Sequence, residues 1–162
     1  SGAGLRWLPV AHSGNQSNSP EEAEAIAGLV MEVTAAGISW TDRLGNVRPL
    51  TLNDILIIAP FNAQVFEIQK RLPGARVGTV DKFQGQEAPI AIYSTATSSP
   101  ADAPRGMEFL YSLNRLNVAT SRAKCICVLV SSPMLFQAEC RTPRQMQLAN
   151  ALCRYLELAR PI

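Results

Sequence analysis

The sequence lacks the long apolar runs and the charge excess that mark several classes of protein. No run of about 18 apolar residues occurs, so no membrane-spanning helix is predicted. The first residues do not combine a basic flank with an apolar stretch, so no secretory signal is predicted. The formal net charge of +2 is too small to indicate a nucleic-acid partner by itself. A chain of 162 residues is long enough for one compact domain with its own core.

The sequence also lacks the cysteine and histidine spacing of a metal site. None of the cysteines belongs to a CxxC pair, and no histidine lies at zinc-ligand spacing from Cys125, Cys127, Cys140 or Cys153. Free cysteines are typically small buried hydrophobes in a reducing compartment, so we expect no metal and a cytoplasmic location. The single histidine, His12, lies in the polar segment AHSGNQSNSP and is predicted to be an exposed loop residue without a catalytic role.

What the sequence does contain is an alternation of short apolar runs with amphipathic segments. Continuous apolar runs are typical of strands buried on both faces, so we predict an α/β fold with a mostly parallel sheet of about five strands. A small hairpin is expected at 38–50, and Trp7 and Trp40 are expected to pack near the sheet edge. The predicted strands are 5–10, 54–60, 76–80, 89–96 and 125–131, and the predicted helices are 20–37, 62–71, 114–124 and 143–160.

The start of the first helix has a specific signature. Ser19-Pro20-Glu21-Glu22 has the spacing of a capping box, in which Ser19 and Glu22 each accept a hydrogen bond from the other's backbone N–H. Pro20 suits the first helical position because its missing N–H would be unpaired there in any case. The predicted buried face of this helix consists of Ala23, Ile26, Ala27, Val30 and Met31.

Polar and glycine residues follow the strand that ends near Val80. Thr79 and the free backbone N–H groups of the turn are suited to hold a phosphate, and Gly85 permits a positive φ. Glu87 is suited to accept a hydrogen bond from a ribose hydroxyl. The alternative is a link between strands whose polar residues only satisfy backbone groups, and short turn motifs do not separate these two interpretations.

Two arginines and one phenylalanine are further candidates. Arg115 and Arg122 lie seven residues apart, on nearly one face of a helix without Asp or Glu, which favours anion binding over a solvated face of ion pairs. Residues 101–162 carry eight basic and four acidic side chains, and this local charge of +4 also favours anion binding. Phe61 follows the 54–59 strand, where it either stacks on a nucleobase or anchors the core, the more common case.

Three segments together resemble a known family. DILIIAPFNAQ, VGTVDKFQGQE and LNRLNVATSRAK, in this order, resemble motifs IV, V and VI of superfamily 1 helicases. The most similar group contains the nonsense-mediated-decay helicase and nuclease–helicases of DNA end processing, including bacterial fusions to a RecB-like nuclease. The resemblance covers about residues 54–132. It implies the second, C-terminal RecA-like domain, a three-layer sandwich, of an ATP-dependent DNA helicase that moves 5′ to 3′.

The resemblance also assigns roles to particular residues. Arg122 matches the arginine finger that reaches the γ-phosphate, a group worth about 10³–10⁵ in hydrolysis rate. It implies that Glu87 contacts the ribose of the nucleotide and that Gly85 and Gln84 shape the same turn. Arg115, the other arginine of this helix, is also expected to bind the nucleotide. The residues implied to contact single-stranded nucleic acid are Thr79, Phe61 and Gln64.

Two motifs of such motors are missing from these 162 residues. No glycine is followed by lysine, so the P-loop GxxxxGK[ST] is absent, and no DExx motif for Mg²⁺ is evident. Relatives carry both in an upstream RecA-like domain, which would bind most of the ATP and Mg²⁺ and would be the partner of this domain. We therefore expect the isolated chain not to hydrolyse ATP. The alternatives are an RNA helicase motor domain and a degenerate RecA-like module that only binds nucleic acid or protein.

Overall fold

A six-stranded sheet, parallel throughout, forms the centre of the computed structural model, which describes residues 2–162. This arrangement confirms the predicted α/β class and is consistent with a RecA-like fold. The strand order is β5-β4-β6-β7-β1-β8, so each of the four central strands has a neighbour on both sides. The strands are β1 (Gly4–Pro9), β4 (Ile55–Ile58), β5 (Arg76–Gly78), β6 (Ala88–Ser94), β7 (Ala123–Ser131) and β8 (Arg160–Pro161).

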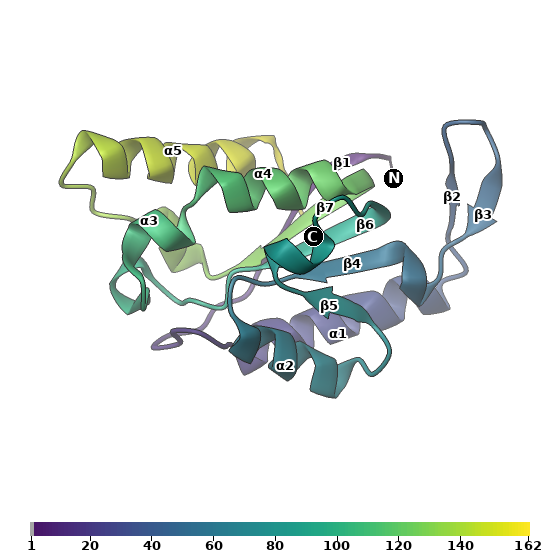
Figure 1. Ribbon diagram of the computed structural model, residues 1–162, viewed down its shortest axis with the longest axis horizontal. Coiled ribbons are helices and arrows are strands. Elements are labelled where there is room, and N and C mark those ends of the chain that lie inside the picture. Colours follow the sequence, from purple (N-terminus) through teal and green to yellow (C-terminus); the bar gives the residue numbers. More distant parts are fainter. Residues whose placement is uncertain (1) are drawn as a thin grey trace.

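Helices cover both faces of the sheet (Figure 1). Helices α1 (Pro20–Ala35) and α2 (Asn62–Arg71) lie on one face, and α4 (Leu113–Arg122) and α5 (Pro143–Leu158) lie on the other. The short helix α3 (Gly106–Leu110) precedes α4. Single-turn 3₁₀ helices occur at Leu52–Asp54, Val80–Phe83 (η2), Pro100–Asp102 and Pro133–Phe136. The predicted 62–71 helix is confirmed with the same bounds.

The two layers of helices enclose two separate cores. Ile57 of β4 pairs with Ile92 of β6, and Ile92 pairs with Val128 of β7, so one row of side chains crosses the sheet on the α1 and α2 side. The neighbouring row, with Ile58 and Tyr93, packs under α4 and α5. All four residues of β4 are buried because both faces of that strand are covered.

The N-terminus of α1 differs from the prediction in one respect. Ser19 caps the helix as expected, since its hydroxyl accepts a hydrogen bond from the Glu22 N–H at 3.1 Å. The Glu22 carboxylate does not return to Ser19, whose N–H instead donates to the Gln64 side chain at 2.7 Å. The capping box is therefore half formed. Met31 was also wrongly placed on the buried face, since 57% of it is exposed.

The predicted hairpin is confirmed as β2 (Ser39–Thr41) and β3 (Val47–Pro49), an antiparallel pair that projects away from the main sheet (Figure 1). Gly45 closes its turn with a φ of +83°. Trp40 lies on this hairpin and is half-buried, and it lines a cavity with Lys124 and Cys125 at the start of β7. Trp7 packs near the edge of the main sheet, on β1, where its ring meets Phe136 edge-on at 5.5 Å.

Candidate functional site

A cavity of about 410 Å³ lies between α4 and η2. Arg115 and Arg122 come from α4 and lie seven residues apart, as predicted for a common helix face. Asp81 and Gln84 face them from η2 and the turn that follows it. Val80, Ser112, Asn114 and Val118 complete the lining.

Neither arginine of this cavity has a carboxylate within ion-pair distance among residues 2–162. Arg122 Nη1 makes a long contact of 3.4 Å with the Gln86 carbonyl, and its buried Nε has no hydrogen-bond partner within the described residues. A guanidinium offers five N–H donors in a planar fork that suits phosphate and carboxylate oxygens. Two unpaired guanidinium groups beside one cavity are therefore suited to an anion with several oxygens.

Burial changes the chemistry of a tyrosine in the core below the cavity. Burial raises the pKa of Tyr93 to about 12, and the positive charge of Arg115 opposes this by a smaller amount. The Tyr93 hydroxyl has no hydrogen-bond partner within residues 2–162. It therefore remains a neutral phenol at physiological pH and supplies no charge to balance the arginine.

Glu87 lies apart from the arginine cavity. It lines a second cavity, of about 270 Å³, between the β2–β3 hairpin and the start of β7, together with Trp40 and Lys124. Its carboxylate is half exposed and lies 3.9 Å from Lys124 Nζ. Along the chain, Gly85 and Gln86 separate Gln84 of the arginine cavity from Glu87, and the Gln86 carbonyl contacts Arg122. Gly85 has a φ of +80°, so the predicted positive φ is confirmed.

The residues predicted to contact a nucleic-acid strand follow β4 and β5. Thr79 is half-buried directly after β5, and its carbonyl accepts the Lys82 N–H at 3.1 Å. Phe61 is half-buried at the N-cap of α2. Gln64 is completely buried, and its side-chain amide hydrogen-bonds to Ser19 and Ser94. Gln64 thus connects two helix starts to the end of β6 and does not face the solvent, contrary to the predicted strand contact.

An aromatic residue that the prediction missed, Phe109, connects Phe61 to the arginine cavity. Phe109 of α3 lies 5.3 Å from Phe61 between ring centroids, with a tilt of 31°. The Arg115 guanidinium lies 3.8 Å from the Phe109 centroid, and that of Arg105 lies 4.8 Å from it. The available signal was a phenylalanine between two arginines in the basic last third of the chain. It lies just after segment 98–106, whose serine, proline and glycine content is typical of a loop.

His12 was wrongly predicted to be exposed. The His12 side chain is fully buried, with Nδ1 2.7 Å from the Ser98 hydroxyl and Nε2 3.0 Å from the Glu22 carboxylate. The same carboxylate accepts hydrogen bonds from the hydroxyls of Ser94 and Thr95 and from the Ala96 N–H. This buried polar network holds the segment that leaves β6 against α1.

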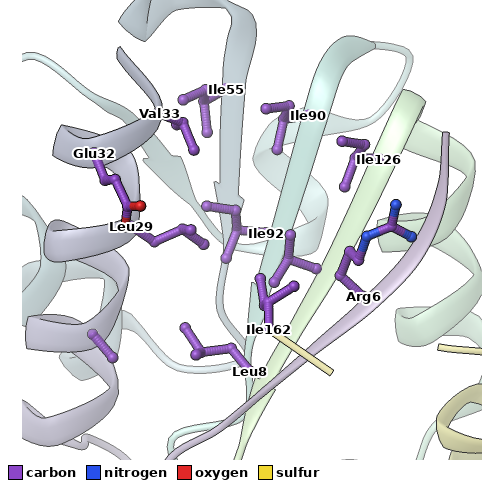
Figure 2. Close-up of a pocket in the computed structure, with 12 residues that line it drawn as sticks. Arg6, Leu8, Leu29, Glu32, Val33, Ile55, Ile90, Ile92, Ile126 and Ile162 are labelled. Atoms are coloured by element: carbon purple, nitrogen blue, oxygen red, sulfur yellow. The ribbon is translucent and has the colours of Figure 1, made fainter. Parts of the chain in front are cut away.

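Another cavity, of about 580 Å³, lies on the α1 face of the sheet. Figure 2 shows isoleucines of the strands on its floor, with Arg6 and Glu32 at opposite sides. Converging polar groups are missing from its lining, so this cavity is not the candidate site. Among residues 2–162, no group of three potential metal ligands occurs, and no helix is long and apolar enough to cross a membrane.

Comparison with known proteins identifies relatives of this chain. A family model described as an AAA domain matches residues 9–134. The DNA replication ATP-dependent helicase/nuclease JHS1 of Arabidopsis thaliana is 30% identical over 142 residues, which cover 86% of this chain and 10% of that protein. Putative helicase mov-10-B.1 of Danio rerio is 34% identical over 109 residues, 57% of this chain and 11% of that protein. RNA helicase Mov10l1 of Homo sapiens is 33% identical over 92 residues, 52% of this chain and 8% of that protein. The chain thus spans about a tenth of the length of these relatives.

Proposed function

This chain belongs to the AAA domain family, and we propose that this helicase-like domain is the second, C-terminal RecA-like motor domain of a superfamily 1 DNA helicase. The observation that carries the proposal is the pair of guanidinium groups of Arg115 and Arg122, which line one cavity without a carboxylate partner among residues 2–162. Such a pair suits a polyphosphate shared with a second domain.

In this proposal Arg122 is the arginine finger. Negative charge spreads over the equatorial oxygens of the phosphoryl group during its transfer, and a fixed guanidinium stabilises that charge. Arg115 binds the same polyphosphate, and Gln84 and Gly85 shape the facing turn. Glu87, which lies in the neighbouring cavity, accepts a hydrogen bond from the ribose. The upstream domain supplies the P-loop and most of the contacts to ATP and to Mg²⁺, which neutralises phosphate charge when it is bound.

The strand-contacting residues in this proposal are Thr79 and Phe61, at the ends of β5 and β4. Phe61 offers a ring for base stacking, which is typically worth about 1–3 kcal/mol per base. Gln64 has no direct part, because it is fully buried between the helix starts. The domains close when the nucleotide binds between them and separate after hydrolysis, so that Phe61 and Thr79 hold the strand differently in the two states.

DNA is the proposed substrate because the relative that matches 86% of this chain is named a DNA replication helicase/nuclease. RNA is the alternative, since Mov10l1 is named an RNA helicase. Phosphate and stacking contacts do not separate the two, because only contacts to the 2′-hydroxyl do so. ATP hydrolysis by the full-length protein, measured with single-stranded DNA and with RNA of the same base sequence, tests the choice. Stronger stimulation by RNA would reverse it.

A degenerate interaction module is the remaining alternative. Such a module has no use for two guanidinium groups that line one cavity without a carboxylate partner among residues 2–162, which favours the motor. The sequence immediately upstream of this chain decides between the two, because a motor requires GxxxxGK[ST] there. ATP turnover by the purified 162-residue chain alone would contradict the proposed division of the site between two domains.

A further inference from the structure

Three side chains from three helices form a continuous row of contacts at the surface. Phe61 is the N-cap of α2, Phe109 lies in the five-residue helix α3, and Arg115 lies in the first turn of α4. Phe109 is the middle member, 5.3 Å from the Phe61 ring and 3.8 Å from the Arg115 guanidinium. The row thus begins at the proposed strand site and ends at the arginine cavity.

Phe109 is the contact that orients Arg115. Among residues 2–162 the guanidinium has no carboxylate within ion-pair distance and makes no side-chain hydrogen bond, so the ring face is its specific partner. A cation over an aromatic face is attracted by the quadrupole of the ring. The long arginine side chain loses rotamer freedom in this contact, so removing the ring returns that freedom.

We propose that Phe109 is a positioning residue that couples binding of a nucleic-acid base at Phe61 to the orientation of Arg115 in the nucleotide cavity. The inference rests on the proposed function, because it takes Phe61 to meet the strand and Arg115 to meet the nucleotide. A base that stacks on Phe61 favours one tilt of the two rings, and the tilt of Phe109 sets where the guanidinium lies. Because the two sites then share one side chain, the nucleotide changes the affinity of the protein for the nucleic-acid strand, and the strand changes its affinity for the nucleotide by the same factor.

The position of Phe109 fits this role. It lies in a helix of only five residues that follows a loop with two prolines, and the ring itself is half-buried. A short helix with few buried contacts moves more easily than the strands of the core. Its neighbour Leu110 is buried in the core, which keeps the helix attached while Phe109 changes its tilt.

The test uses full-length protein in which Phe109 is replaced by leucine, which keeps apolar bulk and removes the ring face. The matched control is Phe66→Leu, because Phe66 is 61% exposed on α2 and also lies under a cation, with Lys70 Nζ 4.7 Å from its ring centroid. The affinity of a fluorescent oligothymidylate is measured with and without a non-hydrolysable ATP analogue. The ratio of the two dissociation constants gives the coupling, and the stimulation of ATP hydrolysis by the same oligonucleotide is measured in parallel.

We expect the coupling ratio of Phe109→Leu to move towards one by about fivefold, which corresponds to about 1 kcal/mol. Phe109→Trp, which restores an aromatic face, should recover most of the coupling, and Phe66→Leu should match the wild type. A loss of structure alone would lower hydrolysis with and without the oligonucleotide equally and leave the ratio unchanged.

The possible outcomes separate this inference from the proposed function. Wild-type coupling that Phe109→Leu retains in full would overturn the role of Phe109 and leave the motor proposal standing. The same holds if Phe66→Leu loses as much coupling as Phe109→Leu. A wild-type protein whose ATP hydrolysis does not respond to any single strand would overturn the proposed function, and this inference with it.

Discussion

Replacing Glu22 by glutamine should destabilise the fold, because the Glu22 carboxylate organises the buried polar network at the end of β6. Glu22 is completely buried. One oxygen lies 3.0 Å from His12 Nε2 and accepts the Thr95 hydroxyl at 2.9 Å. The other accepts the Ser94 hydroxyl and the Ala96 N–H. Ala96 has a φ of +65°, so this carboxylate also holds a non-glycine residue in the left-handed region.

The magnitude follows from the donors that glutamine leaves without an acceptor. A hydrogen bond to a charged group contributes about 1.5–3 kcal/mol, and one between neutral groups contributes about 0.5–1.5 kcal/mol. The amide keeps one oxygen and turns the other acceptor into a donor, so two of the four contacts must rearrange or be lost. The free energy of unfolding should therefore fall by about 2–3 kcal/mol. For a domain of this size that lowers Tm by about 5–10 °C.

The assay is urea unfolding of the 162-residue chain, followed by far-ultraviolet circular dichroism. Glu24→Gln is the matched control, because Glu24 lies two residues further along α1 with its side chain 76% exposed and paired to Arg71 at the surface. The control should change the free energy of unfolding by no more than about 0.5 kcal/mol. A Glu22→Gln protein as stable as the control would refute the reasoning, since the carboxylate would then be dispensable.

Three further predictions concern ionisation and backbone conformation. Burial raises the pKa of the phenol groups of Tyr93, Tyr111 and Tyr155, so their contribution to stability is complete below pH 10 and is lost as pH rises towards 12. A phenolate absorbance titration should therefore show that these tyrosines ionise only when the protein unfolds. Burial also raises the pKa of Cys127 to about 11, so a thiol reagent at neutral pH should modify Cys125 at least about tenfold faster, as mass spectrometry of the labelled peptides would show. Gly85→Ala should lower the free energy of unfolding by about 1 kcal/mol because φ is +80° there, whereas Gly28→Ala in open space on α1 should raise it; equal effects would contradict the turn geometry.

The sheet and its helices could be predicted because their patterns are local. The run ILII of β4 is apolar at every position, which is what a strand covered on both faces requires. The seven-residue spacing of Arg115 and Arg122 places them near one helix face by geometry alone. Strand β8 was missed because its two residues pair with β1 only through the backbone and leave no apolar pattern.

The buried polar groups could not be predicted in the same way. His12 and Glu22 lie in or beside a polar segment that is typical of a surface loop, and their partners Thr95 and Ser98 lie more than 70 residues away along the chain. The capping-box pattern correctly predicted that Ser19 caps the helix, but it predicted the wrong partner for Glu22. The Glu22 carboxylate instead makes tertiary contacts to the segment that leaves β6. Gln64 was expected to contact the nucleic acid because of its motif. Its side-chain amide instead donates a hydrogen bond to the Ser94 hydroxyl in the same buried region.

The rate of ATP hydrolysis by an Arg122→Ala variant of the full-length protein tests the central claim most directly. The assay is run with saturating single-stranded DNA, and nucleotide binding is measured separately. Arg154→Ala is the matched control, because Arg154 is 67% exposed on α5 and paired with Glu157 away from the cavity. We predict that Arg122→Ala lowers kcat by about 10³–10⁵-fold while ATP still binds, and that the control hydrolyses ATP at the wild-type rate. Hydrolysis by Arg122→Ala at the rate of the control would contradict the assignment of Arg122 as the arginine finger.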